Sequence, residues 1–256
     1  MMNLNWTKKR NAVICIVIVL LCIKILTPFL GRPIFIYNKD SLDGKLKKHF
    51  LTCSNVKETL IFNPNIYNLS CIKYCSNLEV LCVSVFPFTK NVDTKYLVND
   101  NVKAVSFAFH SNDWSHLNEC TNLEKISIIN SDFSDTNDIS DLSKLEELYI
   151  DTDNDLNIRI IEKSKKLKRI TLISDKTIDV SGLSKLTNIE YLHIGGKIKN
   201  FNMIKSVSTL QLFGGNDIDF EHLLNINNLE KLVTDCDIPD EIIESLIKKG
   251  VEIVIE

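Results

Sequence analysis

The sequence contains few of the patterns from which catalytic and cofactor sites are built. It has 8 Gly among 256 residues, and none of them lies in a Gly-rich phosphate loop or a nucleophile elbow. There is no Cys-x-x-Cys pair, and His110 and His116 lack the four-residue spacing of a helical zinc pair. We therefore expect a protein that is not an enzyme and that uses no cofactor.

Positive charge is scarce beyond the N-terminus. The chain has 30 basic and 33 acidic residues, which gives a net charge of −3. Residues 1–30 hold 4 basic side chains and no acidic one, so the remainder has 26 basic against 33 acidic residues, or −7. An acidic surface argues against nucleic acid as a partner and against adhesion to anionic lipid.

One short pattern returns about every 22 residues. An apolar residue is followed by two variable positions, a second apolar residue, one variable position and a third apolar residue. Clear copies are Leu145-Leu148-Ile150, Leu167-Ile170-Leu172, Ile189-Leu192-Ile194 and Leu229-Leu232-Thr234. The first positions of all copies are Val56, Leu78, Val102, Leu123, Leu145, Leu167, Ile189, Val207, Leu229 and Val251, with only 18 residues between Ile189 and Val207. Such a period is typical of stacked supersecondary units.

Each copy predicts a short strand, because buried positions four and six alternate with an exposed one. A single strand cannot bury a core, but a stack of them forms a parallel sheet that lines the concave side of a solenoid. A unit of about 22 residues is too short for a full helix on the return, so we expect 3₁₀ turns and short helical pieces on the convex side. The inward-pointing apolar residues of two returns are Ile178, Val180, Leu183, Leu186, Ile218, Phe220, Leu223 and Ile226.

The amino-acid sequence of the clearest copies resembles that of a known repeat family. Thr177–Ile194 reads TIDVSGLSKLTNIEYLHI, and Asn137–Ile150 reads NDISDLSKLEELYI. These segments resemble the internalin type of bacterial leucine-rich repeat, which implies an α/β solenoid of horseshoe shape over residues 56–256. An Asn also precedes the first apolar residue of several copies: Asn55, Asn77, Asn101, Asn122, Asn188 and Asn228.

The chain departs from that family at one position of the repeat. The family places an Asn at the ninth position of each unit, where its side chain forms a ladder of hydrogen bonds to the backbone. Here the ninth positions are Phe86, His110, Ser131, Asp153, Asp175, Lys197, Gly215 and Asp237. The amides of those turns therefore need other partners, and we expect a less regular solenoid.

The N-terminus predicts a membrane anchor. Lys8, Lys9 and Arg10 precede an apolar segment over residues 12–30 that is interrupted only by Lys24. This length is close to that of a membrane span, and the flanking charges predict a cytoplasmic N-terminus with the rest of the chain outside. A cleaved signal peptide and a lipid on Cys22 are the alternatives, but neither recognition pattern is present. We expect residues 1–30 to be tail and anchor, 31–55 a spacer and cap, and 56–256 the repeat domain with its C-terminal cap.

The eight cysteines fit the repeat better than they fit a disulfide framework. Three of them lie three residues before the first apolar residue of a copy: Cys53, Cys75 and Cys120. We expect reduced, buried thiols at these core positions. A Cys53–Cys75 bridge is the alternative, because neighbouring layers lie only about 4.8 Å apart. The others are Cys15 and Cys22 in the apolar segment, and Cys71, Cys82 and Cys236.

An acidic segment follows the strand predicted at 145–150. Asp151, Asp153, Asp155, Ile158 and Glu162 stand at positions 1, 3, 5, 8 and 12 of a calcium-loop pattern. The sixth position, which requires Gly, is Leu156, and a strand rather than a helix precedes the loop. We therefore interpret the segment as an acidic turn and predict no metal site.

The exposed positions of the sheet are the candidate functional residues. Tyrosine and arginine are the residue types enriched at binding hot spots. We predict that a protein or peptide binds the concave face through Tyr149, Arg169, Thr171, Tyr191, His193 and Gln211. Because Glu146, Glu147 and Glu190 surround them, we expect a partner with a basic or aromatic segment. Two other functions stay open: a self-assembling structural or envelope-associated protein, and a calcium-dependent adhesin.

Overall fold

A computed structural model describes most of the predicted repeat domain. It covers residues 34–36, 57–62, 69, 72, 75–85, 91–95, 97, 99–111, 113–158, 164–214 and 218–256. The predicted anchor, nearly all of the predicted spacer, and Cys53, Cys71 and Glu162 lie outside these residues. Within the described part of the chain, no helix combines the length and the apolar composition that crossing a membrane requires.

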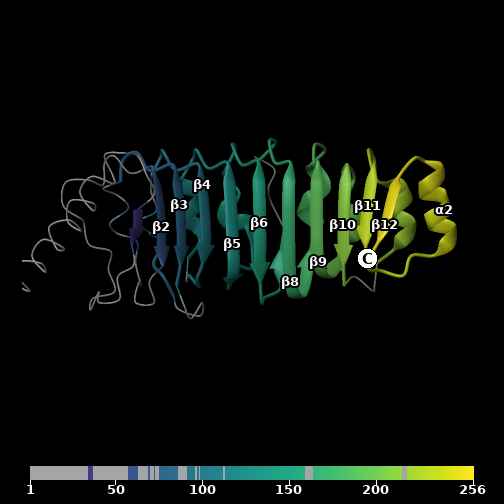
Figure 1. Cartoon of the computed structure of the whole chain (residues 1–256), viewed down its shortest axis with the longest axis horizontal. Helices are drawn as coiled ribbons and strands as arrows, with labels where there is room; N and C mark the ends of the chain where they lie inside the picture. Colours follow the sequence, from purple (N-terminus) through teal and green to yellow (C-terminus); the bar gives the residue numbers. More distant parts are fainter. Residues whose placement is uncertain are drawn as a thin grey trace, which may run out of the picture.

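The described strands form one parallel sheet whose order follows the chain (Figure 1). Equivalent repeat positions lie side by side, so that Leu148 is in register with Ile170, and Ile170 with Leu192. Only β7 lies off the main path, and it pairs with β8. The strands are β1 (Ile34–Ile36), β2 (Glu58–Phe62), β3 (Val80–Ser84), β4 (Ala104–Ala108), β5 (Lys125–Ser131), β6 (Glu147–Thr152), β7 (Leu156–Asn157), β8 (Arg169–Asp179), β9 (Tyr191–Lys199), β10 (Thr209–Phe213), β11 (Lys231–Thr234) and β12 (Glu252–Ile255).

The alternation in each strand produces the predicted buried column. In β6, Leu148 and Ile150 are buried while Tyr149 is only half-buried, and Ile170 and Thr171 repeat this pattern in β8. The first apolar residues are buried from Leu78 onward, except Leu229, which is partly exposed. The predicted strand phase is therefore correct over these layers.

The returns are short 3₁₀ helices, as the unit length predicts. They are η3 (Ser115–Glu119), η4 (Thr136–Ile139), η5 (Ser181–Lys185), η6 (Phe201–Met203) and η7 (Phe220–Asn225). The return of the 18-residue unit is η6, with only 3 residues. Ile178, Val180, Leu183 and Leu186 are all buried, whereas Ile218 and Phe220 are only partly buried against the core.

A ladder of hydroxyl groups stabilises the backbone at the carboxyl ends of the central strands. Thr152 Oγ1 donates a hydrogen bond to the Ser131 carbonyl oxygen at 3.0 Å, and Ser174 Oγ donates to the Asn154 carbonyl at 2.7 Å. The buried hydroxyls of Ser131, Thr152 and Ser174 each also accept a hydrogen bond from the backbone N–H of the residue two positions later. Buried backbone groups without partners are costly. Serine and threonine thus serve here in place of the Asn ladder of the family.

Gly195 and Gly196 lie inside a strand. The sequence suggests a turn at this pair, but β9 continues through both residues to Lys199. Gly196 has a φ of +134°, and a Cβ atom placed on it would lie 2.3 Å from the Ser174 carbonyl oxygen. The glycine is therefore needed because the backbones of neighbouring layers approach closely at the level of the ladder.

A second ladder joins the return segments. Asn99 Nδ2 donates to the Cys75 carbonyl at 2.9 Å, the Cys120 thiol donates to the Leu97 carbonyl at 3.0 Å, and Ser164 Oγ donates to the Leu142 carbonyl at 2.7 Å. Asn99, Cys120 and Ser164 stand three residues before the first apolar residue of their units. Cys75 and Cys120 are buried as predicted, and burial raises the pKa of the Cys120 thiol.

The asparagines that precede several repeats have a similar role nearer the surface. Asn101 Nδ2 donates to the Ser76 carbonyl and Asn122 Nδ2 to the Asp100 carbonyl, both in the preceding unit. Asn228 adopts a left-handed conformation with φ +60° and donates to Ser206 Oγ at 3.1 Å. At these three positions the recurring Asn therefore forms bonds between layers.

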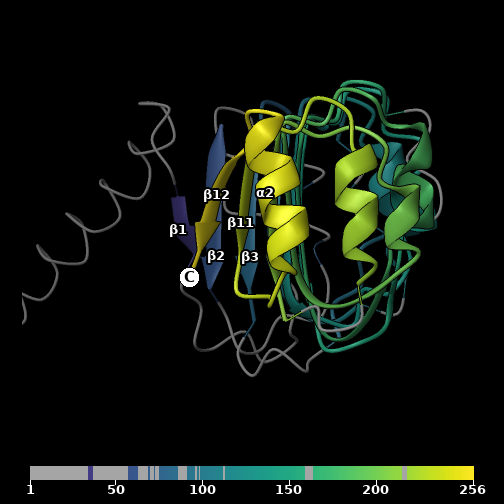
Figure 2. The ribbon, with the colours of Figure 1, turned by 90° about the vertical axis from the view of Figure 1, so that its right-hand side faces the viewer.

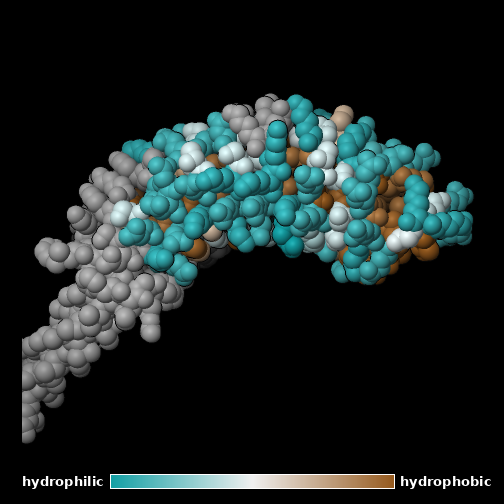
Figure 3. All heavy atoms as spheres, turned by 90° about the horizontal axis from the view of Figure 1, so that it is seen from above, coloured by the Kyte–Doolittle hydropathy of each residue, from teal (hydrophilic) through white to brown (hydrophobic). Residues whose placement is uncertain are grey.

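The stack is bent and is covered at its C-terminal end. Seen from above, the body forms an arc that opens toward the side on which Figure 1 displays the sheet (Figure 3). The end view places the sheet on one side, the 3₁₀ returns on the other, and α2 (Asp240–Lys248) in front of the core between them (Figure 2). Leu246 is the buried residue of this helix. Helix α2 thus covers the end of the core.

Candidate functional site

Parallel pairing arranges the exposed side chains of the concave face in rows. Tyr149, Thr171, His193 and Gln211 are in register on β6, β8, β9 and β10. Glu147, Arg169 and Tyr191 form a second row beside the first. Strands in a sheet lie about 4.8 Å apart, so the predicted residues occupy a patch roughly 15 Å wide. The six predicted residues therefore lie on one continuous surface.

Three of these residues form a connected group at the middle of the patch. The Arg169 guanidinium carbon lies 5.0 Å from the centre of the Tyr191 ring, in cation–π contact. The Tyr191 hydroxyl in turn donates a hydrogen bond to Gln211 Oε1 at 2.8 Å. Tyr191 is thus held between an arginine and a glutamine from the two neighbouring strands. A side chain fixed in this way loses less conformational entropy when a partner binds.

An aromatic residue that the sequence analysis did not single out, Phe213, lies against His193. The rings of His193 and Phe213 are 5.3 Å apart, and the half-buried imidazole has its pKa lowered by desolvation. Phe213 occupies the seventh position of its unit, one alternation beyond Gln211 on the same face. Extending the alternation by one residue beyond the predicted strand would have identified it.

Tyr149 lies at the acidic side of the patch. Burial raises the pKa of its hydroxyl, and the negative charge of Asp151 raises it further. The pKa of Asp151 is itself raised, first by desolvation and then by the charges of Asp153 and Asp175. Tyr149 therefore keeps its proton and offers an apolar ring with a hydroxyl donor beside a group of carboxylates.

The structure gives the residues of the calcium-loop pattern other roles. Leu156, at the sixth position, is fully buried and belongs to β7, and Ile158 is fully buried as well. Asp155 Oδ1 accepts the backbone N–H of Thr177 at 3.0 Å, which joins this turn to the next layer. Among the described residues, no three Asp, Glu, His or Cys side chains are arranged to hold a metal ion. This part of the segment is a turn between layers.

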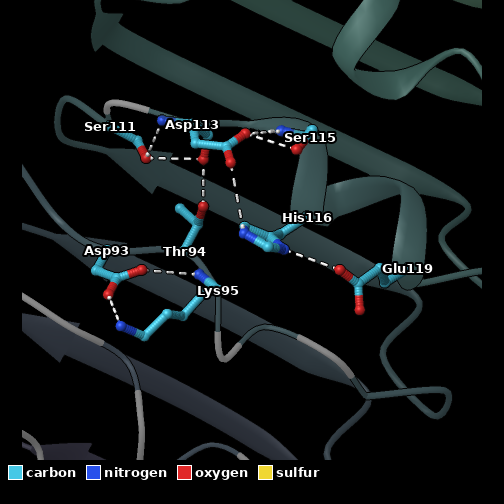
Figure 4. A network of polar contacts seen from close by, with 8 residues as sticks. All are labelled: Asp93, Thr94, Lys95, Ser111, Asp113, Ser115, His116 and Glu119. Atoms are coloured by element: carbon cyan, nitrogen blue, oxygen red, sulfur yellow. Dashed lines mark hydrogen bonds and ion pairs between the residues drawn. The ribbon is translucent and has the colours of Figure 1, made fainter.

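A second group of polar side chains lies on the return side, between the units that begin at Leu78 and Val102 (Figure 4). His116 stands between two carboxylates, 3.5 Å from Asp113 Oδ2 and 2.8 Å from Glu119 Oε1. The hydroxyl of Ser115 donates to Asp113 Oδ1 at 2.6 Å rather than to the imidazole. Because this hydroxyl does not contact the histidine, the group does not have the arrangement of a nucleophile and its base.

The same group fastens one return segment to the next. Thr94 Oγ1 donates to the Asp113 carbonyl oxygen, and Ser111 Oγ donates to the same oxygen at 3.0 Å. Asp93 pairs with Lys95 at 2.8 Å. The bond from Thr94 joins residues 93–95 to residues 111–119, and the other contacts hold each segment in place, so we assign the group a structural role.

Comparisons with known proteins support the fold. No protein-family model matches the chain, and no curated protein sequence matches it significantly. Among solved structures, the internalin inlF of Listeria monocytogenes is 17% identical, with a TM-score of 0.54 over 78% of this chain and 67% of its own length. Internalin C2 of the same organism is 16% identical, with a TM-score of 0.51 over 80% and 81%. The chain therefore has the leucine-rich repeat fold of the internalins, a parallel-sheet solenoid of horseshoe shape.

Proposed function

We propose that this chain is a membrane-anchored, extracytoplasmic leucine-rich repeat protein that binds a protein or peptide through its concave face. The observation that carries the proposal is the group of Arg169, Tyr191 and Gln211 at the middle of the sheet. Exposed aromatic and planar cationic side chains on a rigid sheet are typical of binding hot spots. Solenoids also use their extended concave surface for binding in general.

Residues 12–30 supply the anchor in this proposal, and the acidic repeat domain lies outside the cell. The charges of Lys8, Lys9 and Arg10 support that orientation, because basic residues next to a span stay in the cytoplasm. The division into tail and anchor (1–30), spacer and cap (31–55) and repeat domain (56–256) belongs to the same proposal.

Single substitutions on the concave face test the binding role. A partner is first captured from cell-surface extracts with the full-length chain, and its affinity is then measured for each variant. Tyr149→Ala and Tyr191→Ala should each weaken binding by more than about 1 kcal/mol, as the loss of an aromatic anchor does. Lys185→Ala, on the convex return η5, is the control and should bind as the unchanged protein does. A partner sensitive only to the convex change would overturn the proposal.

Self-assembly is the second candidate function, and one observation favours it. Among the described strands β12 lies at the end of the sheet, and Ile255 on it is 62% exposed. Ile247 on α2 is 57% exposed as well, and apolar surface gathers at the C-terminal end of the stack in Figure 3. An open apolar edge favours strand pairing between chains. Concentration-dependent association in sedimentation, abolished by Ile255→Lys, would favour this function over the first.

A further inference from the structure

The cations of the concave sheet differ in whether a carboxylate already binds them. Among the described residues, the five lysines at the start of a concave strand or directly before it each form an ion pair with a glutamate of a neighbouring repeat. The pairs are Lys57–Glu79 and Lys103–Glu79 at 3.2 Å, Lys125–Glu147 at 2.9 Å, Lys168–Glu190 at 3.0 Å and Lys231–Glu252 at 2.6 Å. Arg169 is the exception. Among the described residues its guanidinium has no carboxylate within 4.0 Å, and its one contact is the Tyr191 ring.

The two glutamates that could neutralise Arg169 are already bound elsewhere. Glu147 is its register neighbour on β6, but Lys125 holds that carboxylate from the other side. Glu190 directly precedes Tyr191, but it is bound by Lys168. The exposed guanidinium is therefore a cation on the concave face whose charge is still available to a ligand.

The geometry also prepares Arg169 for a particular kind of ligand. An aromatic ring attracts the charge of a guanidinium without using up its N–H donors. Those donors form a planar fork that fits the two oxygens of a carboxylate. Tyr191 is fixed in turn by its hydrogen bond to Gln211. The fork is thus positioned before a partner arrives, which reduces the entropy lost on binding.

We propose that Arg169 recognises a carboxylate of the bound protein or peptide, so that the partner presents an acidic side chain or its C-terminus over β8 and β9. The inference rests on the proposed binding role of the concave face and adds the chemistry of the partner. The sequence alone suggests a partner with a basic segment. We infer a partner with a carboxylate instead, because the glutamates nearest to Arg169 are already paired with lysines.

Selection from a random peptide library tests the inference. Peptides are selected on the immobilised full-length chain and synthesised in matched forms: unchanged, with Asp and Glu replaced by Asn and Gln, and with the C-terminus amidated. Their affinities are then measured for the unchanged protein and for Arg169→Gln, Arg169→Lys, Tyr149→Ala and Lys231→Gln. Lys231 lies in the same row as Arg169 and has its own carboxylate partner, Glu252, so Lys231→Gln serves as the matched control.

The expected result is a loss of affinity of about tenfold or more for Arg169→Gln, since bonds between charged groups are the strong ones. Arg169→Lys should recover only part of it, because an ammonium group lacks the fork. The control variant Lys231→Gln should change affinity less than about threefold, as an exposed paired charge contributes little. Loss on amidation identifies the C-terminus as the ligand group, and loss on Asn and Gln replacement identifies a side chain.

Two results would overturn the inference. The first would leave the proposed binding role of the concave face intact, and the second would overturn that role as well. Peptides that lose affinity with Tyr149→Ala, but bind equally well without any carboxylate, would disprove the role of Arg169 and leave the concave face as the binding surface. If no peptide is selected, or if the selected peptides bind all concave variants equally, both the inference and the proposed function fail.

Discussion

Thr152 shows, at the scale of a single residue, how one hydroxyl satisfies two backbone groups. It donates to the Ser131 carbonyl in the preceding layer and accepts the N–H of Asn154 in its own turn. Both contacts are buried or nearly so, where an unsatisfied group costs more than a hydrogen bond gains. The same chemistry recurs at Ser174. Small hydroxyl side chains therefore connect the layers of this solenoid.

We predict that Thr152→Val lowers the free energy of unfolding by about 1–3 kcal/mol, because valine has the same shape but leaves two backbone groups without a partner. Thr171→Val is the matched control. Thr171 is a half-buried residue of the neighbouring strand, and its replacement should change stability by less than about 0.5 kcal/mol. Chemical denaturation of both variants makes the comparison, and equal effects would contradict the assigned role of the ladder.

Leu148 and Tyr149 test the strand phase. Leu148 is 2% exposed and points into the core, whereas Tyr149 points to the concave face. Leu148→Ala should cost about 2–5 kcal/mol through lost burial and the cavity that it leaves. Tyr149→Ala should cost little stability. Denaturant titration gives both values, and a similar loss for the two would mean that the phase is wrong.

At the scale of the structural element, the sequence predicts strands better than the segments that follow them. Alternation identifies Leu148 and Ile170 as buried because a strand has a simple period of two. The ladder is harder to find, because Ser131 and Thr152 stand at different positions of their units and are brought into register by an irregularity in β5. The pair Gly195 and Gly196 suggests a turn in the sequence, yet Gly196 lies within β9. The required close approach is a property of two layers and not of one segment.

We predict that Gly196→Ala destabilises the protein more than Gly250→Ala does. Both glycines have a positive φ, +134° and +85°, so a side chain strains the backbone at either position. Only at Gly196 does the added Cβ meet backbone, the Ser174 carbonyl at 2.3 Å; nothing lies within 4 Å at Gly250. Gly250→Ala should cost about 1–2 kcal/mol from strain alone. Thermal unfolding of both variants decides, and equal costs would rule out the steric explanation.

The sequence could predict which residues belong to the candidate site, but not which contacts they form. Repeat register alone places Tyr149, Arg169 and Tyr191 on one face, because equivalent positions of parallel strands lie side by side. Register does not show which charges are paired. Whether Glu147 turns toward Lys125 or toward Arg169 depends on side-chain conformation, and only the structure gives that choice. The proposed chemistry of the partner follows from the pairing of Glu147 with Lys125, because this pairing leaves the charge of Arg169 available.

At the scale of the whole molecule, the proposed anchor requires a defined orientation in the membrane. We predict that a reporter fused after Glu256 is accessible only from outside the cell and that the chain keeps its full-length mass. The positive residues before the apolar segment are the physical reason. Protease protection and mass spectrometry provide the measurement. A mature chain that begins near residue 30, or a lipid on Cys22, would contradict the anchor.

The order of the sheet has a mechanical consequence. Apart from β7, which pairs with β8, each described strand hydrogen-bonds only to its neighbours in the order β1 to β6 and then β8 to β12. Tension applied between the two ends would therefore load one interface at a time, and layers would detach in sequence instead of rupturing together. A partner that spans β6 to β10 would tie several layers across the direction of pull. Such a ligand would raise the force needed to extend the domain, and the bound protein would yield less under load than the free one.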